Sequence, residues 1–275
     1  MILFLLVLVK ASACGYAEYE CRKVETDSVI VGEFVKRAGE GPFPPDAESL
    51  HFEVVAETRD RLHIKIVDNA EPAYEVVDVV EEAAAGSGSG VAFAESGFRV
   101  SVTEDCGIVV ARRSSGETIF DTRPGSVRHG LAYGKGFVQL STAVGAKPVI
   151  YGLGQRRTRF ALPYPFNYTL TNQDRGTPGD GTNHYGTHPL HVERRAGGRM
   201  HGVLMLTASP LQVEIADGEL TWRMMGGLID LYIFLGGEEG RMEAVVEEYT
   251  ELVGRPCLIP AWTLGLHQCY WGTRT

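Results

Sequence analysis

Short runs of alternating apolar and polar residues constrain the fold of this 275-residue chain more than any other feature. Apolar side chains occupy every second position of residues 50–54 and again of residues 62–66, with Arg59-Asp60 between the two runs. Because neighbouring side chains of a strand point to opposite faces, this pattern predicts a hairpin with one buried face. Further strands are predicted at residues 98–102, 108–111, 137–140, 149–153, 203–206, 211–215 and 220–224.

The run at residues 228–235 is nearly all apolar, so we expect a central strand there. Ala216-Asp217-Gly218 separates two of the predicted strands and is a strong hairpin signal. The 33 glycines fit a chain with many turns. At least nine short strands with no helix between them predict a mainly β protein built as an antiparallel β-sandwich.

The pattern changes at residue 238. In residues 238–253 apolar side chains recur at the spacing of one helical face, and Gly254 follows as a C-cap. Residues 262–269 are then expected to form a buried strand. A sandwich, one helix and one buried strand look like the start of an α/β domain. We expect the sandwich domain at residues 14–237 and the connecting helix and first strand at residues 238–275.

The N-terminus resembles a secretory signal peptide over residues 1–13, because an apolar run at 2–9 is followed by Ala11-Ser12-Ala13. A buried strand is the alternative. Asn167-Tyr168-Thr169 is the only N-glycosylation sequon, and a secretory route would make Asn167 usable. Spacing does not decide how the five cysteines pair, and none forms the CxxC pair typical of zinc or redox sites; they are Cys14, Cys21, Cys106, Cys257 and Cys269.

Charge and spacing exclude several classes of function. Asp and Glu outnumber Lys and Arg by 35 to 26, and a net charge of −9 argues against a nucleic-acid partner. His184, His188 and His191 have helical spacing, but Gly186 and Pro189 between them favour a loop over a metal site. No G-x-S-x-G elbow is present, and we expect no cofactor.

Two residues are candidates for sugar contact. Asp174 lies in a stretch at residues 164–183 that is rich in Pro, Gly, Asn and Asp, which predicts a long irregular loop. It could form a turn or accept hydrogen bonds from sugar hydroxyls. Trp271 could stack on a sugar face or simply pack. From the residues alone, a structural role is favoured for both.

A series of segments, in order along the chain, resembles glycoside hydrolase family 31, the α-glucosidase and α-xylosidase family. These segments are 57–68 (ETRDRLHIKIVD) with 74–76 (YEV), 151–154 (YGLG), 184–189 (HYGTHP), 201–206 (HGVLML), 220–223 (LTWR), 226–236 (GGLIDLYIFLG) and 249–272 (YTELVGRPCLIPAWTLGLHQCYWG). The last two are long and highly specific.

The resemblance implies a galactose-mutarotase-like β-sandwich followed by the first helix and strand of a truncated (β/α)8 barrel. It implies retaining hydrolysis of α-linked glucosides by two aspartates beyond residue 275, so this N-terminal fragment would itself be inactive. Asp174 matches the loop aspartate that contacts substrate in this family, and Trp271 matches a tryptophan lining the sugar pocket. Gln155, Thr171 and Tyr270 depart from the usual residues, which leaves the substrate preference open.

The expected partners are an α-glucosidic oligosaccharide and the missing C-terminal barrel, with no nucleic acid and no membrane span. The expected location is the secretory pathway, outside the cell or in a lysosome or vacuole. Two alternatives remain: a non-catalytic carbohydrate-binding β-sandwich, and a sugar mutarotase, which would need an acid and a base in a concave sheet face.

Overall fold

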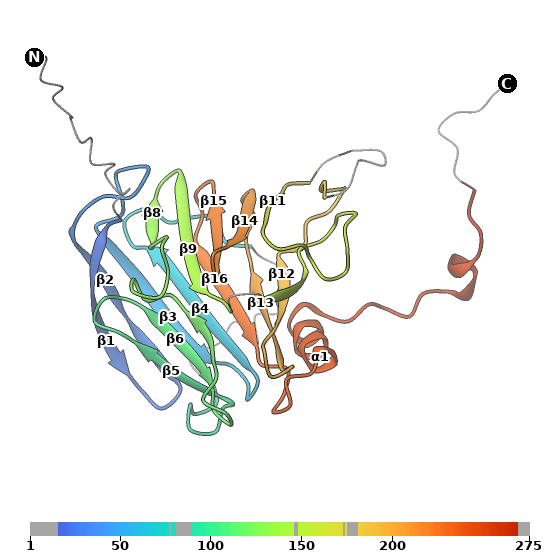
Figure 1. Cartoon of the computed structure of the whole chain (residues 1–275), viewed down its shortest axis with the longest axis horizontal. Coiled ribbons are helices and arrows are strands. Elements are labelled where there is room, and N and C mark those ends of the chain that lie inside the picture. Colours follow the sequence, from blue (N-terminus) through green and yellow to red (C-terminus); the bar gives the residue numbers. More distant parts are fainter. Residues whose placement is uncertain are drawn as a thin grey trace, which may run out of the picture.

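The computed structural model describes residues 16–76, 79–80, 90–145, 148–172, 174 and 181–268. Within these residues the chain forms three antiparallel sheets, one α-helix and a short 3₁₀ helix (Figure 1). The strands are β1 (Glu18–Glu25), β2 (Val29–Ala38), β3 (Ser49–Ala56), β4 (Arg61–Asp68), β5 (Phe98–Val102), β6 (Ile108–Arg112), β7 (Thr118–Asp121), β8 (Ala132–Gly134), β9 (Phe137–Ala143), β10 (Val149–Gly152), β11 (Phe166–Leu170), β12 (Leu190–Arg194), β13 (Met200–Met205), β14 (Leu211–Ala216), β15 (Glu219–Met224) and β16 (Ile229–Phe234).

The largest sheet has eight strands in the order β1-β2-β3-β4-β16-β13-β12-β10. A five-stranded sheet, β11-β14-β15-β9-β8, lies against it, and β5-β6-β7 form a third sheet. Every strand that the alternating pattern predicts is present, and the antiparallel sandwich is confirmed. The predicted hairpin between β14 and β15 closes through Asp217 (φ 52°) and Gly218 (φ 81°), the left-handed pair that a tight two-residue turn requires.

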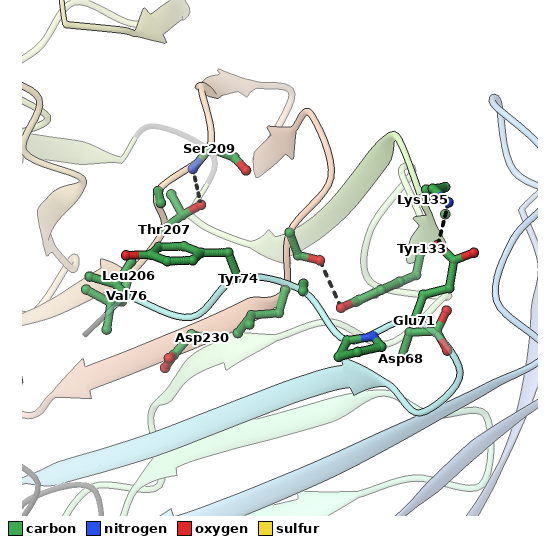
Figure 2. A pocket seen from close by; sticks show the side chains of 16 residues that line it. Asp68, Glu71, Tyr74, Val76, Tyr133, Lys135, Leu206, Thr207, Ser209 and Asp230 are labelled. Carbon is green, nitrogen blue, oxygen red and sulfur yellow. Dashed lines mark hydrogen bonds and ion pairs between the residues drawn. The ribbon is translucent and has the colours of Figure 1, made fainter.

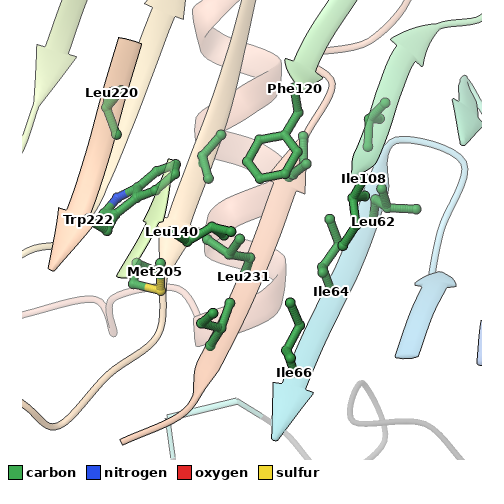
Figure 3. Packing of buried hydrophobic residues seen from close by; sticks show 14 of the residues in the cluster. Leu62, Ile64, Ile66, Ile108, Phe120, Leu140, Met205, Leu220, Trp222 and Leu231 are labelled. Atoms are coloured by element: carbon green, nitrogen blue, oxygen red, sulfur yellow. The ribbon is translucent and has the colours of Figure 1, made fainter. Parts of the chain in front are cut away.

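The main core lies between the sheets (Figure 3). Inward-facing side chains of β4, β13 and β16 in the large sheet meet those of β9 and β15 in the five-stranded sheet and of β6 and β7 in the third sheet. Trp222 of β15 is fully buried and its ring lies 6.3 Å from that of Phe120. Large aromatic side chains contribute most of the apolar area of such a core. This interface fixes the two sheets against each other and so fixes where their loops emerge.

The helix α1 (Met242–Val253) covers part of the other face of the large sheet. Val245 and Leu252 are fully buried there against Leu204, Tyr232 and Phe234. The odd-numbered residues of β16 face the sandwich core, and its even-numbered residues lie on the opposite face of the sheet, the face that α1 covers. All six residues of β16 are therefore buried. The predictions of a central strand and of an amphipathic helix ending at Gly254 are therefore confirmed.

Two predictions about local structure are wrong. The stretch 164–183 is not irregular throughout, because Phe166–Leu170 form β11, with residues 166, 168 and 170 buried and the two between them exposed. Residues 262–268 do not form a buried strand: Ala261–Leu264 form an exposed 3₁₀ helix, and Leu266 is 99% exposed. A strand depends on hydrogen bonds to neighbouring strands, and none lies beside this segment within the described residues.

No helix of the described residues has the length and apolarity needed to cross a membrane. The expected signal peptide at residues 1–13 lies outside the described residues, as do Cys14 and Cys269.

Candidate functional site

The candidate site is a group of loops that we call the loop platform, made of residues 153–165, 171–172, 174 and 181–189. Gln155 joins its two main segments. Its backbone N–H donates to the Gly186 carbonyl (3.2 Å), and its carbonyl accepts from the His184 N–H (2.9 Å). Its side-chain oxygen accepts from the Gly186 N–H at 3.2 Å. These three hydrogen bonds join the turn after β10 to the segment before β12.

Arg156 closes the loop that follows β11. Its guanidinium donates to the carbonyls of Thr169 (3.2 Å) and Gly181 (2.6 Å), which lie on the two sides of that loop. The same group stacks over the Tyr168 ring, 4.1 Å from its centroid. Burial lowers the pKa of Arg156 from its ordinary value, and the facing ring helps to hold the cation in place. The two ends of the loop are thus fixed to one side chain.

Asn183 provides the second anchor of the same loop. Its side chain is 3% exposed, and its amide nitrogen lies 2.7 Å from the Thr171 carbonyl. It lies 3.0 Å and 3.1 Å from the carbonyls of His184 and Gly186. Because a buried amide is costly unless it is hydrogen-bonded, these contacts hold the loop base in one conformation.

Asp174 is exposed on this anchored loop, three residues beyond Thr171. An exposed carboxylate on a fixed base can accept hydrogen bonds from hydroxyl groups of a ligand. Trp271, the other predicted sugar contact, lies outside the described residues.

The platform is linked to α1 through His188. Its Nε2 lies 2.8 Å from the Tyr249 hydroxyl, and the two rings meet edge to face at 5.3 Å. His191, by contrast, is buried in β12, where its ring approaches Trp222. Among the described residues, no group of three or more His, Cys, Asp or Glu side chains is placed to hold a metal ion.

Asn167 of the sequon is exposed on β11, the edge strand of the five-stranded sheet. It pairs with Glu214 on the neighbouring strand, and the period-two pattern turns its side chain away from the core.

A separate cavity of about 460 Å³ lies where the segment after β4, the β8–β9 turn, the loop after β13 and the start of β16 meet (Figure 2). Tyr74 stands over it, and the Tyr133 hydroxyl donates to the Gly227 carbonyl at 3.1 Å in its wall. Glu71 and Lys135 form an ion pair of 3.5 Å at its rim. Asp174 is not among its lining residues. The cavity draws its lining from four separate segments, so no local sequence motif marks it.

The inner face of the large sheet carries an acid beside a base, as a mutarotase would require. Glu193 and His201 lie 3.6 Å apart, and burial raises the pKa of Glu193 to about 7. Both residues, however, are only 1% exposed. A sugar cannot reach them, so this pair does not support the mutarotase alternative.

The described residues thus form an antiparallel sandwich with a loop platform and one helix docked on the large sheet. Residues 48–214 match the glycosyl hydrolase 31 N-terminal galactose mutarotase-like domain. The chain belongs to glycoside hydrolase family 31, and it corresponds to the N-terminal domain of the family's α-glucosidase-like enzymes.

Two α-glucosidases are similar to this chain over most of its length. The chain is 36% identical over 236 residues to lysosomal alpha-glucosidase of Mus musculus, covering 84% of this chain and 23% of that protein. It is 32% identical over 245 residues to an alpha-glucosidase of Hordeum vulgare, covering 82% and 27%. The chain therefore spans about a quarter of the length of these curated relatives.

Solved structures share the fold at low sequence identity. A GH31 dextranase of Flavobacterium johnsoniae, complexed with isomaltotriose, superposes with a TM-score of 0.71 at 14% identity, covering 91% of this chain and 30% of that one. A glucosidase II alpha subunit gives a TM-score of 0.66 at 14% identity, covering 94% and 37%. The galactose-mutarotase-like sandwich is thereby confirmed.

Proposed function

We propose that this chain is the N-terminal part of a retaining α-glucosidase, in which the loop platform forms part of the rim of the sugar pocket. The observation that carries the proposal is the position of Asp174, an exposed carboxylate on a loop held at both ends by Arg156 and Asn183. Named relatives at 32–36% identity are α-glucosidases. Asp174 would hydrogen-bond hydroxyls of an α-linked glucoside.

In this proposal the sandwich domain covers residues 14–237, and residues 238–275 supply the connecting helix and a segment that joins the barrel. Residues 261–264, which form an exposed 3₁₀ helix in this structure, would belong to the first barrel strand only when the other barrel strands lie beside them. The exposed apolar side chains beyond α1 support it, since Leu258, Leu264 and Leu266 are 76–100% exposed. Such side chains would gain a core by pairing with the barrel that follows. Trp271 would then lie just past the end of the first strand and line the pocket.

The chemistry would be retaining hydrolysis by two carboxyl groups about 5–5.5 Å apart, one attacking the anomeric carbon and the other protonating the leaving oxygen. Both groups would come from aspartates outside these 275 residues, so the chain alone should not turn over substrate. We further propose a secretory route for the enzyme, with residues 1–13 as signal peptide and Asn167 glycosylated. Lysosomal and plant α-glucosidases among the relatives support this location.

The test compares Asp174→Asn with the wild type in the full-length protein, using release of 4-nitrophenol from its α-glucoside. Loss of a hydrogen bond to a charged group, about 1.5–3 kcal/mol, should lower kcat/KM by roughly 10- to 100-fold. Asp217→Asn is the matched control, because Asp217 is also an exposed aspartate and lies at the β14–β15 turn, away from the loop platform. Equal kinetics for the two variants would remove Asp174 from the substrate site.

Two further measurements test the rest of the proposal. Proton NMR of the sugar first released by the full-length enzyme should show retained α-configuration, and a β-product would contradict the two-step mechanism. The 275-residue chain should release no 4-nitrophenol. The non-catalytic carbohydrate-binding alternative predicts a different pair of results. The 275-residue chain would bind maltose in calorimetry, and the full-length protein would show no turnover.

A further inference from the structure

Two cysteines far apart in the sequence meet at one edge of the sandwich. Cys21 lies in β1, the edge strand of the eight-stranded sheet, and Cys106 lies in the turn between β5 and β6. Both are partly buried and both pack against the main hydrophobic core. Cys257, the other described cysteine, is exposed on the segment after α1.

Contacts on either side of the pair hold the two segments together. The Cys21 N–H donates to the Glu104 carbonyl at 3.0 Å, two residues before Cys106. The Lys23 ammonium donates to the Val102 carbonyl at 2.7 Å. Burial and, to a smaller extent, the neighbouring Cys21 thiol raise the pKa of Cys106. The β5–β6 turn is thus fixed on β1 independently of any covalent link, and Cys21 and Cys106 lie as neighbours at the edge of the core.

We propose that Cys21 and Cys106 form a disulfide in the mature protein, fastening the third sheet to the edge of the large one. The bond would form by exchange with a small disulfide such as oxidised glutathione. One cysteine thiolate attacks the glutathione disulfide, forming a mixed disulfide and releasing one glutathione thiolate. The second cysteine then loses its proton and displaces the other glutathione. The two cysteines are oxidised, and one glutathione disulfide is reduced to two glutathione thiols.

Burial governs when this exchange can occur. It raises the pKa of both thiols above the ordinary cysteine value, so little thiolate is present in the folded protein at neutral pH. The bond should therefore form during folding, before the β5–β6 turn closes over β1. An oxidising secretory compartment would supply the disulfide reagent.

The experiment refolds the 275-residue chain from denaturant in a glutathione redox buffer, blocks remaining thiols by alkylation and maps the peptides without reduction. Trypsin leaves Cys14 and Cys21 in one peptide, so a glutamate-specific protease that cuts after Glu18 and Glu20 is added to separate them. The expected result is a peptide containing Cys21 linked to one containing Cys106. Alkylated Cys106, or Cys106 linked to another cysteine, would overturn the proposal.

Thermal unfolding provides the second measurement. A link that closes a loop of this length should raise the unfolding temperature by about 5–10 °C. Reduction should remove that gain in the wild type and in the control Cys257→Ser, but should change nothing in Cys106→Ser. Equal responses of all three proteins to reduction would count against the bond. Neither measurement involves substrate, so failure here is separate from failure of the proposed glucosidase function.

Discussion

The charge state of His63 should govern the pH dependence of stability. On the outer face of the large sheet its ring stacks on Tyr232, with centroids 4.2 Å apart and planes at 6°. Its Nε2 lies 2.7 Å from Asp230 and its Nδ1 lies 3.2 Å from Glu57. Burial opposes the charged form of the imidazole, but hydrogen bonds to the two carboxylates outweigh it and raise the pKa to about 9.

The size of the effect follows from the difference between this pKa and the ordinary value of 6.5. A difference of about 2.5 corresponds to roughly 3 kcal/mol of stability at most. Because the pKa is raised in the folded state, the contribution is complete below pH 6.5. It declines as the pH rises and is gone once the pH has passed 9. The sheet should therefore be most strongly held together at mildly acidic pH.

The assay is urea unfolding of the 275-residue chain and of His63→Gln at pH 6 and pH 9.5. Glutamine keeps a polar side chain but cannot take up the proton. Between these pH values the wild type should lose about 2–3 kcal/mol more unfolding free energy than the variant. His51→Gln on the adjacent strand β3 serves as a matched control and should follow the wild type. The reasoning fails if the wild type and His63→Gln show the same pH dependence.

Three further substitutions test the packing and the loop anchors by urea unfolding. In Gly202→Ala the new Cβ would lie 2.5 Å from a methyl group of Val245, which should cost about 1–3 kcal/mol and be partly relieved by Val245→Ala. Arg112→Met should cost more than about 3 kcal/mol, because the buried guanidinium donates to three backbone carbonyls at 2.9–3.0 Å. Asn183→Ala should cost about 2 kcal/mol and speed limited proteolysis near Asp174; unchanged proteolysis would mean the amide does not hold the loop.

The sequence predicted the strands in which burial and polarity alternate together. It missed strands that are mostly exposed and strands whose buried side chains are polar. The edge strand β1 is mostly exposed, so few apolar residues mark it. In β12 the inward-facing residues are His191 and Glu193, which are buried although polar, and this removes the expected alternation. In β11 the alternation is present, but the surrounding Pro and Gly residues concealed it.

The candidate site was predictable only in part. The loop after β11 and Asp174 within it were found from composition and from the family resemblance. The anchors Arg156 and Asn183 were not, because their hydrogen bonds go to backbone carbonyls, which every residue type carries. The cavity beneath Tyr74 was missed for a related reason, since its walls come together only through sheet pairing.

The helix α1 has a role that neither its length nor its sequence would indicate. One side of it packs on the large sheet through Val245 and Leu252, and Tyr249 on it contacts His188 of the loop platform. The chain leaves the same helix toward the exposed segment at 258–266. In the proposed enzyme, the position of Asp174 relative to the following barrel would therefore be set through this helix. A change that shifts α1, such as Gly202→Ala, should then weaken substrate binding in the full-length protein without touching the sugar.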